Sequence, residues 1–194
     1  MKYFKKLVGE RIYLSPINPD DLETYTEYLN DLETGLPIGQ ATRSLSLARE
    51  KEILERMTKE DHTFAIIRGD GDEERMIGNC DLYDVDHRDR RAMLGIFIGD
   101  HASRGKGYGT EAIKLLLEYG FGLLNLENIM LTLDGYNQRG IRCYEKCGFK
   151  IMGRRRSAKY ISGVAYDIIY MDILREDFSG DIRNRLPQYF REVE

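Results

Sequence analysis

The sequence predicts a mixed α+β fold, with a mostly antiparallel twisted sheet of about seven strands, flanked by helices and containing one parallel junction. From residue 63 onward, short segments with period-two alternation follow one another across polar turns, which is typical of hairpins. A strongly apolar helical segment then separates two further strands, and a crossover of this kind joins parallel strands with a right-handed connection.

The first segments predict a strand, two helices and a loop. Residues 10–14 alternate polar and apolar side chains, and Asn18 to Asp21 has the residue types of a helix start. Apolar residues follow at helical spacing, and residues 45–57 predict a second helix. Residues 31–42 contain two glycines and a proline, so we expect a loop there.

The remaining segments predict the rest of the sheet and two more helices. We expect strands at 64–67, 76–82, 92–98, 129–133, 149–153 and 165–174, and helices at 110–124 and 137–146. The crossover joins the strands at 92–98 and 129–133, and the last two strands form an antiparallel pair. With 194 residues, 42% of them hydrophobic, the chain fits one domain over 1–194, with a core at about 9–178 and a C-terminal extension at 179–194.

Charge and hydropathy exclude several classes of partner. The chain has 29 basic and 33 acidic residues, which argues against general electrostatic binding of nucleic acid or of an anionic membrane. No segment approaches the ~20 apolar residues of a membrane span. We therefore expect a cytoplasmic protein.

The cysteines do not predict a metal site. Cys143 and Cys147 are four residues apart, so a helix places them on one face, but no histidine accompanies them. Together with Cys80 they are interpreted as reduced core thiols, and no metal is expected.

A glycine-rich loop is the main candidate for a binding site. Arg104-Gly105-Lys106-Gly107-Tyr108-Gly109 lies between a predicted strand and a predicted helix. Alternate glycines let the backbone turn tightly with its N–H groups outward, and the helix dipole adds positive potential. The loop therefore predicts a pyrophosphate site, to which the charges of Arg104 and Lys106 would contribute.

Two other phosphate-binding motifs fit the loop less well. A nucleotide triphosphatase has GxxxxGK[ST], which is absent from the sequence. A dinucleotide site needs GxGxxG and repeated βαβ units, but Thr110 stands at the third glycine position. A nicotinamide dinucleotide site and a purely structural helix start both remain open on the loop alone.

A second motif gives the loop its context. Asn137 is followed seven residues later by Tyr144 and then by the pair Gly148-Phe149. With Arg104, Gly107 and Gly109 in a [RQ]-x-x-G-x-[GA] loop, the sequence resembles the GNAT acetyltransferases. It is most similar to the branch that holds ribosomal-protein alanine and spermidine N-acetyltransferases. The resemblance runs from about residue 11 to about residue 178.

The resemblance implies a GNAT fold in which the fourth and fifth strands diverge and acetyl-CoA enters the gap as cosubstrate. It implies an N-acetyltransferase that acts on a primary amine by direct attack in a ternary complex. Tyr144 would be the general acid, and an N–H near Phe97 the oxyanion donor. The implied cofactor-binding residues are Ile96, Phe97, Ile98, Arg104, Gly105, Lys106, Gly107, Tyr108, Gly109, Thr110, Asn137 and Tyr144. A helix cap is the alternative for Asn137, and a packed aromatic for Tyr144.

The general base is missing from its usual place. Relatives in this branch often carry Glu after the Ala that begins the fourth strand, and Met93 stands there instead. Asp81, Asp84, Asp134 and His101 are candidates by proximity. A catalytically idle acyl-CoA binding module is therefore an alternative function.

The acceptor is left open by the sequence. In the family it meets the loop between the first two helices and the last hairpin, which are residues 31–42 and 154–166 here. Asp31 and Glu33 would attract an amine, whereas Arg154 to Arg156 and Lys159 would repel one. A protein N-terminus, a polyamine and other small amines fit equally, and a homodimer is a further open alternative.

Overall fold

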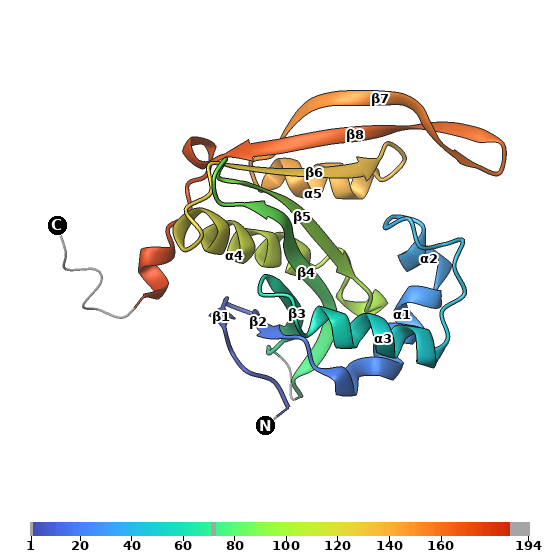
Figure 1. Ribbon diagram of the computed structural model, residues 1–194, viewed down its shortest axis with the longest axis horizontal. Coiled ribbons are helices and arrows are strands. Elements are labelled where there is room, and N and C mark those ends of the chain that lie inside the picture. Colours follow the sequence, from blue (N-terminus) through green and yellow to red (C-terminus); the bar gives the residue numbers. More distant parts are fainter. Residues whose placement is uncertain (1, 71–72, 187–194) are drawn as a thin grey trace.

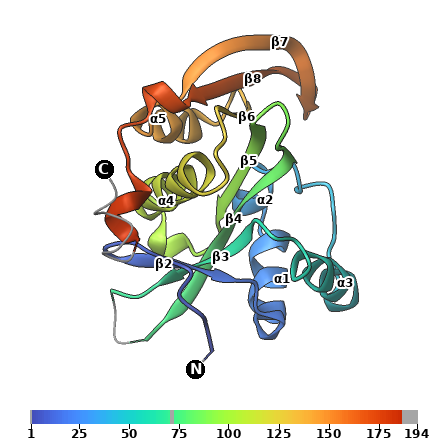
Figure 2. The ribbon, with the colours of Figure 1, turned by 60° about the vertical axis from the view of Figure 1, so that its left-hand side comes forward.

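The computed structural model describes residues 2–70 and 73–186. Within them, one sheet of eight strands has the order β1-β2-β3-β4-β5-β6-β8-β7, with helices on both faces (Figures 1 and 2). The strands are β1 (Leu7–Val8), β2 (Ile12–Pro16), β3 (Thr63–Arg68), β4 (Arg75–Asp86), β5 (Arg91–Ile98), β6 (Asn128–Asp134), β7 (Lys150–Ile161) and β8 (Val164–Leu174). The helices are α1 (Leu22–Asn30), α2 (Leu32–Gly35), α3 (Leu47–Met57), α4 (Tyr108–Gly122) and α5 (Gln138–Lys146).

The predicted topology is confirmed, with the parallel junction between β5 and β6. These two strands pair only from Arg91 opposite Asn128 to Met93 opposite Met130, although β5 continues to Ile98. The second half of β5 therefore has β4 on one side and an open edge on the other. The extra strand β1 is an edge strand of two residues, too short to show a period in the sequence.

Three segments differ from the sequence prediction. The expected loop at 31–42 contains α2, whose first turn is capped by the Asp31 side chain. The strands β4 and β7 run past their predicted ends, and Asp84 therefore lies inside β4, as Asp81 does. Most residues of β7 are exposed, so no buried face marked its length in the sequence.

Two apolar layers fix the position of the sheet. One face packs on α4, where Leu115, Leu116 and Leu117 are all buried, which explains the nearly continuous apolar run of this helix. The other face packs on α1 and α3 through Tyr25, Tyr28 and other side chains. Consequently β5, which is central, presents Ile96 and Ile98 toward α4 and Phe97 toward α1.

The buried Glu50 predicts that stability depends on pH. Glu50 is 0% exposed on α3, and within the described residues neither of its carboxylate oxygens has a hydrogen-bond partner. Burial raises the pKa of this carboxyl to about 7. The folded state holds this proton more tightly than the unfolded state does, so the contribution of Glu50 to the free energy of unfolding is fully present below pH ~4.5. The free energy of unfolding then falls by about 3 kcal/mol as pH rises to about 7.

We expect Glu50→Gln to remove this dependence. Urea unfolding at pH 5 and pH 8 should show nearly equal stability at the lower pH and a variant more stable than wild type at the higher one. Glu52→Gln is the matched control, because Glu52 is on the same helix with its side chain 68% exposed. A wild-type protein as stable at pH 8 as at pH 5 contradicts the assignment.

Candidate active site

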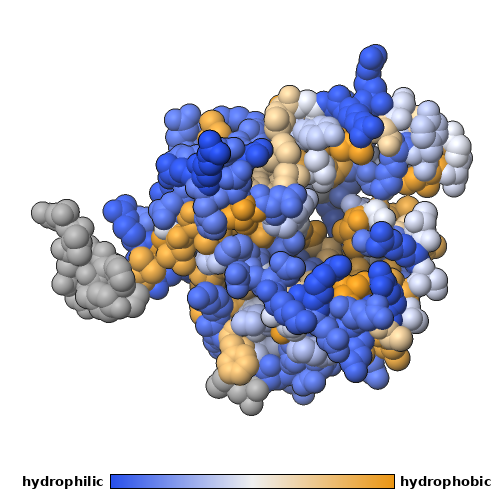
Figure 3. All heavy atoms as spheres, viewed as in Figure 1, coloured by the Kyte–Doolittle hydropathy of each residue, from blue (hydrophilic) through white to orange (hydrophobic). Residues whose placement is uncertain are grey.

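A cavity of about 670 Å³ lies where β5 and β6 diverge. Figure 3 shows this face of the molecule hollowed between the part that carries β7 and β8 and the part that carries α1 and α2. The sequence-predicted cofactor residues that line the cavity are Ile96, Phe97, Ile98, Arg104, Gly105, Gly107, Tyr108, Gly109, Thr110, Asn137 and Tyr144. Lys106 does not line it. Two motifs that are distant in sequence thus meet around one space.

The glycine-rich loop has the backbone that an anion site requires. Gly105 and Gly107 adopt φ of +73° and +89°, a conformation that side chains rarely adopt. Gly107 is the N-cap of α4, no side chain caps this helix, and the Glu111 N–H donates to Gly107 O at 3.0 Å. The N–H groups of the three helical residues before Glu111 have no intrahelical acceptor, and all three residues line the cavity.

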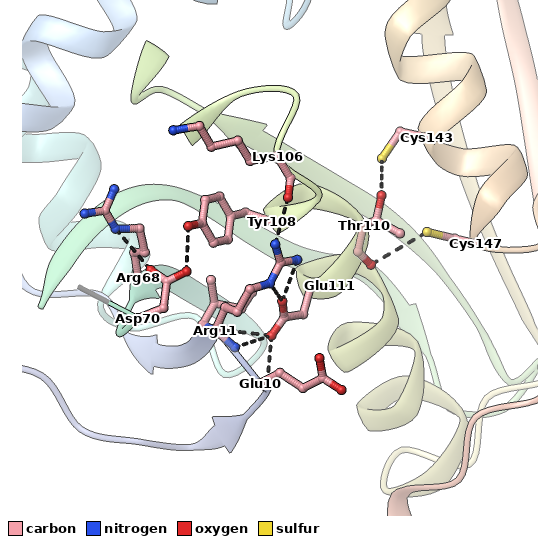
Figure 4. A network of polar contacts seen from close by, with 11 residues as sticks. Glu10, Arg11, Arg68, Asp70, Lys106, Tyr108, Thr110, Glu111, Cys143 and Cys147 are labelled. Atoms are coloured by element: carbon pink, nitrogen blue, oxygen red, sulfur yellow. Dashed lines mark hydrogen bonds and ion pairs between the residues drawn. The ribbon is translucent and has the colours of Figure 1, made fainter. Parts of the chain in front are cut away.

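A partly buried ion pair holds the loop against the sheet (Figure 4). Arg11 donates from Nη1 to Lys106 O at 2.8 Å, and its Nη2 lies 3.0 Å from Glu111 Oε2. Glu111 Oε1 also accepts from the N–H groups of Glu10 and Arg11 at 2.7 and 2.9 Å. The start of β2 and the first turn of α4 are therefore tied together under the loop.

Arg104 is engaged on the other side of the loop. Its Nε donates to Ile98 O at 3.0 Å, its Nη2 donates to Thr34 Oγ1, and Nη1 lies 3.2 Å from Glu33 Oε1. The side chain is only 6% exposed. In this conformation Arg104 holds α2 against the end of β5, whereas the sequence assigned its charge to phosphate.

Basic residues on α5 also line the cavity. Arg139, Arg142 and Lys146 line the cavity opposite the loop. Their i, i+3, i+7 spacing places them on one face of the helix. The sequence interpretation missed them, although that spacing was the signal available. With the N-terminus of α4, they make this end of the cavity positive and suited to phosphate groups.

The register of β5 decides which backbone groups reach the cavity. Ile98 O accepts from Arg104 and Gly99 N–H donates to Ile77 O, while a Cβ atom on Gly78 would overlap Phe97 O. Phe97 therefore points its N–H and C=O toward β4. Because these groups alternate along a strand, Ile96 and Ile98 are directed to the open edge. The N–H donor expected near Phe97 would therefore be that of one of its two neighbours.

Tyr144 and Asn137 come from α5. The Asn137 side chain accepts from Gly140 N–H at 2.9 Å, so it caps the helix while lining the cavity. Tyr144 packs edge-on against Phe149 with ring centroids 5.7 Å apart. Burial raises the pKa of the Tyr144 phenol above its usual value, so the hydroxyl remains protonated at neutral pH.

Two of the candidate bases are held by other groups. Asp134 Oδ2 accepts from Tyr136 OH at 2.7 Å and pairs with Lys159 at the cavity wall. The His101 Nε2 atom lies 2.8 Å from Asp31 Oδ2, and the histidine is outside the cavity lining. Both groups therefore already have polar partners.

The charges expected to meet the acceptor are partly neutralised. Asp31 accepts from Thr34 N–H and Oγ1–H at 2.8 and 2.7 Å, and these bonds with His101 hold the pKa of the carboxyl well below its usual range. Lys159 is paired with Asp134. Glu33, with a side chain 68% exposed, is the acidic group at the cavity mouth.

Two further observations concern the described residues alone. No three His, Cys, Asp or Glu side chains converge there in the manner of a metal site. No helix among them is both long and apolar enough to cross a bilayer. Cys143 and Cys147 do share one face of α5, where both sulfurs contact Thr110 (Figure 4).

Known proteins are similar to this chain in sequence and in fold. A family model described as an acetyltransferase (GNAT) domain matches residues 11–150. The spermidine N(1)-acetyltransferase of Escherichia coli (strain K12) is 33% identical over 120 residues, which cover 58% of this chain and 64% of that enzyme. The SPbeta prophage-derived uncharacterized N-acetyltransferase YokL of Bacillus subtilis is 26% identical over 171 residues, covering 88% and 93% of the two chains.

The fold is similar to that of the spermidine N-acetyltransferase from Vibrio cholerae, solved in complex with CoA and spermine. The TM-score is 0.77 at 23% identity, over 89% of this chain and 100% of that one. Because the family model spans well over half of the sequence, the chain belongs to the GNAT acetyltransferases. The resemblance drawn from the two motifs is confirmed, and the chain spans about 64% of the length of the spermidine N(1)-acetyltransferase that it matches.

Proposed function

We propose that this protein transfers the acetyl group of acetyl-CoA to a primary amine by direct attack in a ternary complex. The observation that carries the proposal is the single cavity that joins the loop, the open edge of β5 and Tyr144. The loop and the basic face of α5 suit the phosphates. The unpaired backbone of β5 suits the amide groups of a pantetheine arm.

Two groups of this chain would assist the transfer of the acetyl group. Acetyl-CoA supplies the acyl group and a thiol leaving group. An N–H of Ile96 or Ile98, directed to the open edge, donates to the acyl oxygen as negative charge develops on it. Tyr144, kept protonated by its burial, gives a proton to the sulfur that leaves.

We infer that the acceptor is a small alkylamine and that polyamines should be tested first. Glu33 places a carboxylate at the cavity mouth. Lys159, a basic side chain in the same lining, is already paired with Asp134. Spermidine acetylation by relatives of this chain supports the same class. Arg154 to Arg156 do not line the cavity, so their charge does not oppose an amine there.

A panel of primary amines with acetyl-CoA, followed by thiol release, tests the proposal. Spermidine, spermine, shorter diamines, amino sugars and peptides with free N-termini form the panel. Saturable release with an amine, and an acetylated product by mass spectrometry, is the expected result. Thiol release no faster than spontaneous hydrolysis across the panel would remove the proposed activity.

A second candidate is an acyl-CoA binding module without turnover. It is favoured by Met93 at the usual Glu position and by the engagement of Asp134 and His101. Binding of acetyl-CoA by calorimetry, combined with no turnover of any amine, would select it.

A further inference from the structure

Asp81 lies beside the cavity at the one point of β5 that has no side chain. In the register of β4 and β5, Asp81 is directly opposite Gly95. A Cβ atom on Gly95 would overlap Asp81 Oδ1, so the carboxylate occupies the space that a side chain would fill. Gly95 itself lines the cavity, between Leu94 and Ile96. Only the glycine backbone therefore separates the Asp81 carboxylate from the open edge of β5.

The carboxylate also meets a second space. A cavity of about 580 Å³ is lined by Asp81 and by Tyr83, which lines the main cavity as well. Tyr83 Cε1 would be 3.6 Å from a Cβ atom on Gly95, so the ring and the carboxylate lie side by side there. Asp81 thus stands between the proposed reaction site and this second cavity.

Asp81 has no partner that would hold it as a permanent anion. Among residues 2–70 and 73–186, no donor and no cation bonds to its carboxylate. Burial, followed by the nearby Glu60, raises its pKa to about 6. On its two neighbouring strands it faces Thr63 and Gly95. The other charged or titratable groups that line the second cavity are Arg56, Glu60, Asp61, His62, Tyr83 and Asp84.

We propose that Asp81 takes the proton of the acceptor amine, in place of the carboxylate that Met93 does not supply. This role rests on the proposed acetyl transfer. The ammonium gives one proton to Asp81, which passes it to solvent through the second cavity. The neutral nitrogen then attacks the acyl carbon, and negative charge moves onto the acyl oxygen. As the carbon–sulfur bond breaks, Tyr144 gives its proton to sulfur. The second proton lost by nitrogen leaves through Asp81, which is ionised again, and Tyr144 regains a proton from solvent. The reaction releases one proton overall.

The pH dependence of kcat tests this role. Asp81 must be ionised to accept a proton, so wild-type kcat should fall as pH drops below about 6. Asp81→Asn should lower kcat at pH 7 by roughly 100-fold or more, abolish this acid limb and leave the Kd of acetyl-CoA unchanged. Asp81→Glu should restore part of kcat, and its kcat should again fall at low pH. Asp89→Asn, in the turn between β4 and β5 with a side chain 58% exposed, is the matched control and should behave as wild type.

Gly95→Ala gives an independent readout, because its methyl group would displace the carboxylate without removing it. Gly95→Ala should also lower kcat. Unfolding midpoints are measured for every variant, to show that each one folds. Wild-type kcat and an intact acid limb in Asp81→Asn would overturn the role of Asp81 and leave the acetyltransferase standing. A wild-type protein that binds acetyl-CoA and acetylates no amine would overturn the proposed function and, with it, this role.

Discussion

Replacing Tyr144 by Phe is expected to lower kcat by roughly 100- to 1,000-fold and to leave the Kd of acetyl-CoA unchanged. The phenol lines the cavity, and burial keeps it protonated, so the substitution removes the proton intended for the departing sulfur. The Phe ring retains the edge-on contact with Phe149, which preserves the helix position. Steady-state thiol release and calorimetry of acetyl-CoA binding measure the two quantities.

Tyr160→Phe is the control for the loss of a tyrosine hydroxyl, since Tyr160 is 69% exposed on β7. It should retain wild-type kcat. An unchanged kcat in Tyr144→Phe would take Tyr144 out of the chemistry and leave it as a packed aromatic. A fall in acetyl-CoA affinity without a fall in kcat would assign it to binding alone.

Replacing Glu111 by Ala is expected to destabilise the protein by about 3 kcal/mol. Its carboxylate accepts from three consecutive backbone N–H groups, those of residues 10–12, and pairs with Arg11, and the side chain is only 16% exposed. Removing it leaves those donors and the Arg11 guanidinium without their anionic partner. Because Arg11 also holds Lys106 O, the loop should loosen and acetyl-CoA should bind more weakly.

Urea unfolding compares Glu111→Ala with Glu52→Ala, whose side chain is 68% exposed on α3. The control should lie within ~0.5 kcal/mol of wild type. A loss of less than ~1 kcal/mol in Glu111→Ala would show that the network in Figure 4 contributes little to the stability of the fold.

Local patterns in the sequence were sufficient for most of the fold. The alternation of strand residues, the apolar run of α4 and the glycines at Gly105 and Gly107 each depend on neighbours a few positions away. The prediction lost accuracy in β7 and in α2. In β7 both faces are exposed, and α2 forms because Asp31 caps it, a contact that competes with the loop preference of Gly35 and Pro37.

Sequence patterns indicated the residues whose place depends on the backbone or on a helix position. They were less informative about which groups a side chain contacts. Gly107 and Tyr144 line the cavity as expected. Arg104 binds the end of β5 and α2, because Thr34 and Glu33 come within its reach only after folding. Likewise, the place of Asp81 depends on its register with Gly95, which no local pattern encodes.

Calorimetric titration with acetyl-CoA tests the central claim most directly, which is that the loop and the open edge of β5 form its binding site. The wild type should bind one molecule per chain with a roughly micromolar Kd, and NAD should not compete. Gly107→Ala should weaken binding by about 10-fold or more, because the residue has φ +89° and its new methyl group would lie 3.2 Å from Arg11 Nη2. Absence of acetyl-CoA binding, or binding unaffected by Gly107→Ala, would contradict the claim.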